Sequence, residues 1–261
     1  MLHWLHELPL LAGISLVCAA FVIPTIVGSL LVQRQVARLF LGEKEITTVL
    51  GYMINAFAVY FGVLLALLSI TVFENRNRAQ DSMDREAASL IRLVRDLRAY
   101  PEPIRGQLLG GLHEYVEEEI GPGWQAQQRG SFSLKEVRLM NELHHTLTAF
   151  EPSKQSEILN HSETLRSFSN FIENRRLRIA QGEASVPPIM WYVILCGAVM
   201  NVILIWSFDL RRGTHAIVAG TLAFFIGLVI YMVALLDQPF LGPNGLKPDE
   251  MIAIHRADDL Q

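Results

Sequence analysis

The amino-acid sequence predicts an all-α integral membrane protein, with four transmembrane helices split two and two by a soluble helical bundle. Four long apolar runs carry this prediction: residues 8–32, 46–73, 186–208 and 214–236. None contains Asp, Glu, Lys or Arg, and each exceeds the ~20 residues that span the hydrocarbon core of a bilayer. Because a chain inside lipid must satisfy its own backbone hydrogen bonds, each run is expected to be a helix.

A charged block of 112 residues, 74–185, separates the two pairs of runs. It holds 17 of the 26 acidic residues and 15 of the 22 basic residues. The chain therefore divides into a membrane part over 1–73, a soluble domain over 74–185, a second membrane part over 186–236 and a C-terminal tail over 237–261. The near-neutral balance of charge gives no reason to expect nucleic-acid binding, and no cofactor is expected.

The block is predicted to be helical throughout. Residues 74–100 continue the second apolar run without Gly or Pro, so one long helix through both is expected. A second helix follows, and Gly121-Pro122-Gly123 predicts a break after it. Ser133 with Glu136 three residues later is a capping-box pattern, which predicts the start of a third helix. A fourth helix over 152–181 leads back to the bilayer, and four such helices favour a bundle.

The distribution of Lys and Arg predicts the orientation. Four crossings place both termini and the block on one side, and the short connections 33–45 and 209–213 on the other. Near the helix ends, the block's side carries ten Lys and Arg residues and the short connections carry five. Because positive charge is retained in the cytoplasm, the block and both termini are expected to be cytoplasmic.

Small and polar residues form a stripe along the second run. They recur every three or four residues, which places them on one helix face: Gly51, Asn55, Ala58, Gly62, Ala66 and Ser69. Small residues let helix backbones approach closely, so helix packing is one explanation of the stripe. The alternative is a pore shared between subunits, in which the amide of Asn55 faces water. The first and fourth runs carry similar small residues, and Asn201 in the third run raises the same question.

Arginine residues flank the membrane runs on the side of the block. The five nearest are Arg76, Arg78, Arg175, Arg176 and Arg178. They either contact lipid headgroups, as juxtamembrane arginines commonly do, or form a ring of positive charge that concentrates anions at a pore entrance.

Several classes of function are disfavoured. No ionisable side chain lies deep in any run, which argues against a proton-coupled carrier and an intramembrane protease. Cys18 and Cys196 both lie in apolar runs and provide no disulfide or zinc framework. His113 and Glu117 share a helix face, but the second histidine of a zinc-protease motif is absent, so no metal site is expected. No catalytic constellation is found, and we expect no enzyme.

Four segments resemble one family. They are Arg85-Glu86-Ala-Ala-Ser-Leu90, Asn174-Arg175-Arg176-Leu-Arg178, Pro187-Pro188-Ile-Met-Trp191 and Leu236-Asp237-Gln-Pro239-Phe240-Leu-Gly242-Pro. Together they resemble the bacterial bestrophin-like membrane proteins. The resemblance implies the two-and-two layout, a bacterial inner-membrane location and an oligomeric ion channel. The aromatic pore-neck motif and the acidic calcium clasp of the animal channels are not found.

The segment around Asp237, Pro239, Phe240 and Gly242 also has a structural interpretation. Pro239 prevents the fourth helix from continuing, and Phe240 can lie at the membrane interface. The residues from Gly242 onward form a turn. Asp237 is expected to pair with one of the arginines that precede the third membrane run.

Two functions follow as hypotheses. The first is a homo-oligomer that conducts ions passively, with the bilayer and other copies of the chain as its partners. The second is a sensing or scaffold protein whose cytoplasmic bundle binds a ligand or partner, while the membrane helices only anchor it.

Overall fold

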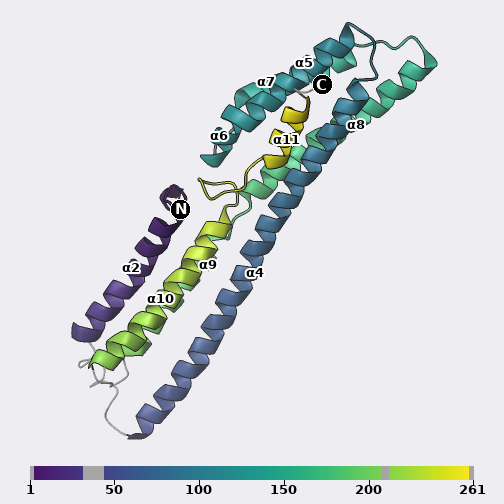
Figure 1. The fold of residues 1–261 in the computed structure, drawn as a ribbon. Helices are drawn as coiled ribbons and strands as arrows, with labels where there is room; N and C mark the ends of the chain where they lie inside the picture. Colours follow the sequence, from purple (N-terminus) through teal and green to yellow (C-terminus); the bar gives the residue numbers. More distant parts are fainter. Residues whose placement is uncertain (1–2, 32–43, 207–211, 259–261) are drawn as a thin grey trace. The chain divides into compact units, whose positions relative to one another are not determined.

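The computed structural model describes residues 3–31, 44–206 and 212–258 (Figure 1). Within these ranges the chain is helical and contains no strand. The short connections predicted over 33–45 and 209–213 lie mostly outside the described residues. The chain divides into two compact units, a membrane unit of Met1–Glu74 with Ser185–Asp237 and a soluble unit of Asn75–Ala184 with Gln238–Gln261.

The four apolar runs all form helices long and apolar enough to cross a bilayer. They are α2 (Leu10–Leu31), the first part of α4 (Lys44–Leu97), α9 (Pro188–Trp206) and α10 (Arg212–Asp237). A short helix, α1 (His3–His6), precedes them. The prediction of a helix that continues past residue 73 is confirmed, because α4 is helical to Leu97. It ends where Pro101 makes further helix unfavourable.

Two apolar clusters hold the membrane unit together. One joins α4, α9 and α10 through side chains that include Phe61, Leu65, Ile194 and Ile230. The other joins α1, α2 and α10 around Tyr231.

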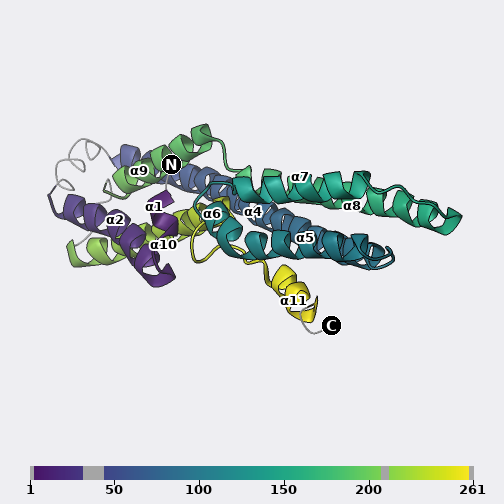
Figure 2. The same cartoon turned by 90° about the horizontal axis from the view of Figure 1, so that it is seen from above.

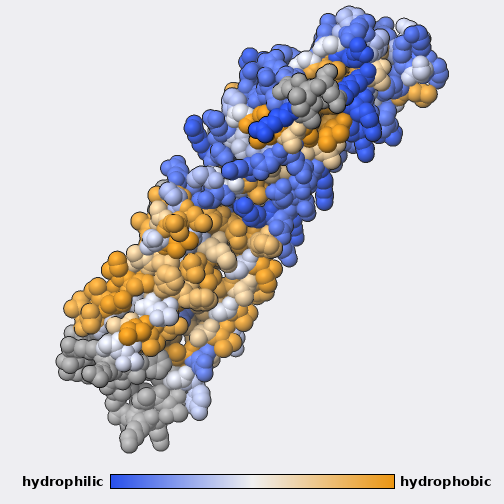
Figure 3. Space-filling model, in the orientation of Figure 1, coloured by the Kyte–Doolittle hydropathy of each residue, from blue (hydrophilic) through white to orange (hydrophobic). Residues whose placement is uncertain are grey.

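The outer surface of the membrane unit is also apolar. Leu11 on α2, Tyr60 on α4 and Ile189 on α9 are 78%, 77% and 65% exposed, respectively. In Figure 3 apolar residues spread over these helices, whereas polar residues cover those of the soluble unit. A soluble protein rarely exposes so large an apolar surface, so the natural surroundings of these helices are lipid.

The soluble unit is built from the second part of α4 and four more principal helical segments. They are α5 (Ile104–Glu118), α7 (Leu134–Thr148), α8 (Gln155–Glu183) and α11 (Asp249–Asp258), with a π-helical turn η1 (Glu119–Gly123) and the short α6 (Trp124–Gln128) between α5 and α7. Figure 2 shows α4, α5, α7 and α8 running alongside one another. One cluster joins these four helices, with Leu93, Leu108, Leu147 and Phe171 completely buried in it.

Of two local predictions in the soluble unit, one is confirmed and one needs correction. The helical path breaks at Gly121-Pro122-Gly123 as predicted, because the backbone at Gly121 is non-helical (φ −103°, ψ −105°) and kinks the chain between α5 and α6. Ser133 does cap α7, since its hydroxyl accepts from the Glu136 amide at 3.5 Å. The Glu136 carboxylate, however, does not complete the capping box but binds Arg175.

Candidate functional site

The stripe of the second membrane helix lies on the outside of the described chain. Asn55, Ala58, Gly62 and Ala66 are exposed, and Gly51 and Ser69 are half-buried. The stripe is centred roughly 90° around the helix from the face buried in the membrane core, at 100° per residue. A methyl group added at Gly51 or Gly62 would meet no described atom within 4 Å.

The small residues of the other membrane helices have a different role. A methyl group added at Gly227 of α10 would lie 3.1 Å from the Cys18 Cα of α2. Gly13 of α2 lies against Tyr231, and Gly197 of α9 lies against Phe61. Close packing within the chain therefore explains Gly13, Gly197 and Gly227, but no described residue lies within 4 Å of a methyl group added at Gly51 or Gly62 on the α4 stripe.

The two membrane asparagines also differ. The Asn201 amide donates to the Gly197 carbonyl of its own helix at 3.1 Å and is half-buried. Asn55 is exposed, about 14 Å along the helix from residue 46, the start of the apolar run. An exposed amide at that depth requires water or a partner, because an unsatisfied polar group in hydrocarbon is costly.

The five arginines do not form one exposed group. Arg78 and Arg176 are exposed, and Arg76 is half-buried. Arg175 and Arg178 instead turn inward, with side chains only 13% and 1% exposed. The expectation that these two contact headgroups or a pore entrance therefore needs correction, since their guanidinium groups bind carboxylates inside the soluble unit.

Arg178 is the centre of a buried ionic network. Its guanidinium donates to Glu86 of α4, to Glu119 of the π-helical turn and to the side-chain oxygen of Gln127 of α6. It also lies 5.3 Å from the centre of the Trp124 ring, within the range of a cation–π interaction. One side chain of α8 thereby connects α4, η1 and α6.

Arg175, one turn earlier on α8, extends this network to α7. Its Nη2 donates to Glu136 at 2.6 Å, and its Nε lies 3.7 Å from Glu119. The Tyr115 hydroxyl donates to Glu119 as well. The network thus contains two guanidinium groups and three carboxylates, which leaves one negative charge in excess when all are ionised.

Two carboxyl groups of the network have raised pKa values. Burial raises the pKa of Glu86 to about 7, although the Arg178 guanidinium opposes the rise. Burial also raises the pKa of Glu136. Burial alone would lower the pKa of Arg178, but the adjacent Glu119 and Glu86 carboxylates keep it above its usual value. Near neutral pH the network is therefore able to hold one proton on a carboxylate.

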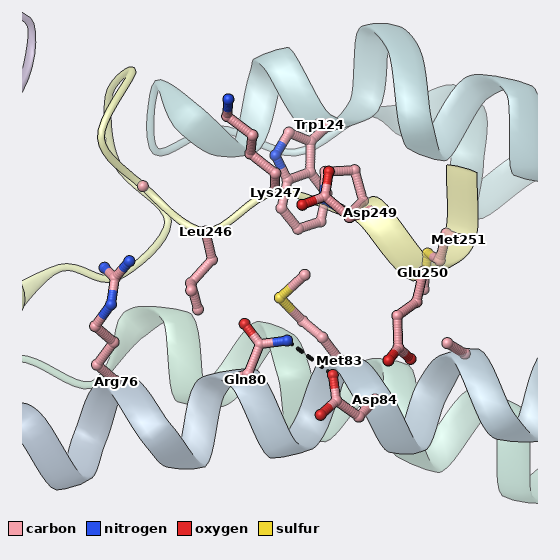
Figure 4. Close-up of a pocket in the computed structure, with 13 residues that line it drawn as sticks. Arg76, Gln80, Met83, Asp84, Trp124, Leu246, Lys247, Asp249, Glu250 and Met251 are labelled. Atoms are coloured by element: carbon pink, nitrogen blue, oxygen red, sulfur yellow. Dashed lines mark hydrogen bonds between the residues drawn. The ribbon is translucent and has the colours of Figure 1, made fainter. Parts of the chain in front are cut away.

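A cavity of about 260 Å³ lies on another side of α4 in the soluble unit (Figure 4). Arg76, Gln80, Met83 and Asp84 of α4 line one wall, and the Gln80 amide donates to Asp84 at 2.8 Å. Trp124 and the segment from Gly245 to Met251 line the rest. The buried Trp124 indole N–H has no hydrogen-bond partner among the described residues. Arg76, expected at the membrane surface or a pore entrance, lines this cavity.

The contacts of Asp237 and Phe240 differ from those that the sequence predicts. The Asp237 carboxylate accepts from the Val186 amide at 2.5 Å and from the Trp191 indole, so it caps the start of α9. Phe240, expected at the membrane interface, is 3% exposed and stacks edge-on against Trp124 at 5.7 Å. Pro239 is buried, and Gly242 has a φ of +69°, a conformation that favours glycine in a turn.

Sequence reasoning missed Glu86, Glu119, Glu136, Tyr115 and Trp124 as members of one site. Their separations in sequence are large, with 92 residues between Glu86 and Arg178. One signal was present, because Glu86 and Arg178 both lie in segments that carry the family resemblance. A charged residue in such a segment on a core-facing helix position is a candidate for a buried pair.

Comparison with known proteins identifies the family. A crystal structure of a membrane protein has a similar fold, with a TM-score of 0.56 and 12% identity, over 88% of this chain and 96% of that chain. Comparison with curated proteins gives no significant match. A family model described as a bestrophin-like domain matches residues 19–251. Because this match covers most of the sequence and agrees with the helical membrane fold, the chain belongs to the bestrophin-like family.

Proposed function

We propose that the protein is a homo-oligomeric channel that conducts ions passively across the bacterial inner membrane, with the α4 stripe facing the pore. The observation that supports it best is the exposed amide of Asn55 on a face of small residues that no described part of the chain covers. Gly13, Gly197 and Gly227 pack against neighbouring helices of the chain, whereas Gly51 and Gly62 do not, so we assign the α4 stripe to a contact outside the chain.

The energetics favour this assignment over a lipid-facing stripe. A row of glycine and alanine offers lipid little contact, but it allows a second helix to approach closely. Asn55 in hydrocarbon lacks hydrogen-bond partners beyond its own helix, whereas at a subunit contact or a water-filled pore its amide is satisfied. The membrane runs contain no Asp, Glu, Lys or Arg, and their one histidine, His215, lies at one end of the fourth run, which agrees with a passive path.

The proposal includes the layout that the family resemblance implies. Two membrane helices precede and two follow a bundle that we place in the cytoplasm together with both termini. Arg76, Arg78 and Arg176 remain candidates for headgroup contact or for attracting anions near the bilayer. We assign no enzymatic activity.

Cysteine accessibility tests the pore assignment. The two native cysteines are first removed by Cys18→Ala and Cys196→Ser. A single cysteine is then introduced on the stripe, by either Gly62→Cys or Ser69→Cys. Leu67→Cys, on an exposed bulky face of the same helix, is the matched control. The purified chain is reconstituted in liposomes, and ion flux is measured before and after a charged, water-soluble thiol reagent.

The expected result is flux that the reagent reduces in the two stripe variants and leaves unchanged in Leu67→Cys. Flux that is absent from the reconstituted parent chain, together with a monomeric state in detergent and in lipid, contradicts the channel. Flux that responds only at Leu67→Cys contradicts the stripe as its lining.

A second candidate function is ligand sensing by the soluble unit. The observation in its favour is the cavity beside α4, which Trp124 lines together with both acidic and basic side chains. Titration of Trp124 fluorescence with candidate metabolites, in variants that retain only that tryptophan, tests it. Saturable quenching that Gln80→Leu abolishes, in a chain without ion flux, favours sensing over conduction.

A further inference from the structure

Three potential metal ligands from two distant segments meet in the soluble unit. They are His113 and Glu117 of α5 and His255 of α11. One donor atom of each lies within 4.8 Å of the others. His113 Nε2 is 3.5 Å from Glu117 Oε1, and the two imidazole rings are 4.7 Å apart between centroids.

The helices position these side chains independently of any ion. His113 and Glu117 are four residues apart and therefore lie on one face of α5. On α11, Met251 is buried and Ile254 packs against the core cluster of the bundle. This apolar anchoring holds α11 beside α5, where Ile254 and His255 line a groove together with Leu109 and His113.

We propose that His113, Glu117 and His255 bind one divalent transition-metal ion, with Zn²⁺ as the best match. Two imidazole nitrogens and one carboxylate oxygen are a ligand set that Zn²⁺ accepts in tetrahedral geometry, with water in the fourth position. Nitrogen ligands disfavour Ca²⁺ and Mg²⁺, which prefer oxygen.

The distances require only small side-chain movements. Ligand atoms about 2.0–2.1 Å from a tetrahedral ion lie about 3.3 Å from one another. The separation of 3.5 Å between His113 and Glu117 is close to that value. The third ligand lies within 4.8 Å of the other two, so it has to approach by at most about 1.5 Å. The His113 and Glu117 side chains are 42% and 57% exposed, so the protein does not enclose them on every side.

Local charge has opposing effects on a bound cation. His255 lies in the last turn of α11, where the negative end of the helix dipole favours a cation. Arg98 lines the same groove, and its charge opposes one. We therefore expect an affinity on the order of micromolar.

Such an ion connects the C-terminal helix to the bundle. His255 lies beyond the residues that the family model matches, so the third ligand comes from a part of the chain outside the family domain. Metal binding adds a bond between α11 and α5 to the apolar contacts that already hold them together. The proposal concerns only the contact between α11 and α5 and does not depend on ion conduction.

Metal titration of the full-length chain tests the site. The protein is purified in detergent, freed of any polyhistidine tag and treated with a chelator. Zn²⁺ binding is measured by calorimetry, and Co²⁺ is used as a spectroscopic probe of tetrahedral geometry. The variants are His113→Ala, His255→Ala and Glu117→Gln, and His145→Ala, an exposed histidine of α7, is the control.

The expected result is one ion per chain, with at least a tenfold loss of affinity in each histidine variant and none in the control. Zn²⁺ should also slow amide hydrogen exchange in α11 of the parent chain, and not in His255→Ala. Unchanged exchange in α7 and α8 of the variants shows that the bundle remains folded. Zn²⁺ binding that persists in His113→Ala and His255→Ala, or the absence of binding by the parent chain, overturns the proposal.

Discussion

Replacing Arg178 with alanine tests whether the buried ionic network holds the soluble unit together. The Arg178 side chain is 1% exposed, and its guanidinium binds Glu86, Glu119 and Gln127. Truncation leaves two carboxylates, 0% and 2% exposed, without their principal cation. Arg175 still lies 3.7 Å from Glu119, so the Glu86 charge suffers the larger loss.

The magnitude follows from the cost of an unpaired buried charge. Removing one partner of a buried ion pair typically costs about 3–5 kcal/mol, because the remaining group keeps its desolvation penalty. Glu86 reduces the cost by taking up a proton, as its pKa is already raised to about 7. Arg178→Ala is therefore expected to destabilise the soluble unit by about 3 kcal/mol, the lower end of that range.

Hydrogen exchange with mass spectrometry measures this in the full-length chain in detergent. Peptides from α5, α7 and α8 should exchange roughly 150-fold faster in Arg178→Ala, since each 1.36 kcal/mol is a factor of about ten. Arg176→Ala, two residues away and exposed, is the matched control, and its effect should stay within about 0.5 kcal/mol. Peptides of α2 report on the membrane unit and should not change.

A triple variant separates charge from packing. R178M/E86Q/E119Q removes the cation and both carboxylates together, so it should recover most of the stability lost in Arg178→Ala. Equal destabilisation by the single and triple variants would refute the reasoning, because the cost would then arise from lost packing. Equal effects of Arg178→Ala and Arg176→Ala would refute it as well.

Three further outcomes follow from the structure. Folded Glu86 keeps its proton up to about pH 7, whereas the unfolded chain releases it above about pH 4.5, so the free energy of unfolding should fall by up to about 3 kcal/mol as the pH rises through that window. Glu86→Gln should flatten this dependence in thermal melts. Gly227→Leu should destabilise the membrane unit, because its side chain meets Cys18, whereas Gly62→Leu should leave the monomer intact and weaken oligomers measured by light scattering. Gly242→Ala should cost about 1 kcal/mol, because its φ is +69°.

The regular parts of the fold were predictable because they depend on local sequence. Apolar length identifies the four membrane helices, and the lack of Gly and Pro between residues 74 and 100 predicts that α4 continues past the second apolar run. The break at Gly121-Pro122-Gly123 was predictable for the same reason, because Gly and Pro interrupt an α-helix and the backbone at Gly121 is non-helical.

The ionic network was not predictable for a different reason. Arg175 and Arg178 shortly precede a membrane helix, which is a position where arginine normally faces water or headgroups. Their partners are on four other helical segments and are recognised only when the bundle is assembled. Glu136 was assigned to a helix cap because that local role has a sequence signature, whereas its bond to Arg175 has none.

The contact between Phe240 and Trp124 has a consequence for synthesis. Phe240, with Ala79, Met83 and Trp124, forms an apolar cluster of the soluble unit, although α9 and α10 separate it in sequence from the other three. A nascent chain that has just completed α8 therefore lacks one side of that cluster. The soluble unit can complete this cluster only after the ribosome has made α9 and α10. Its last folding step is therefore expected to follow synthesis of the whole membrane part.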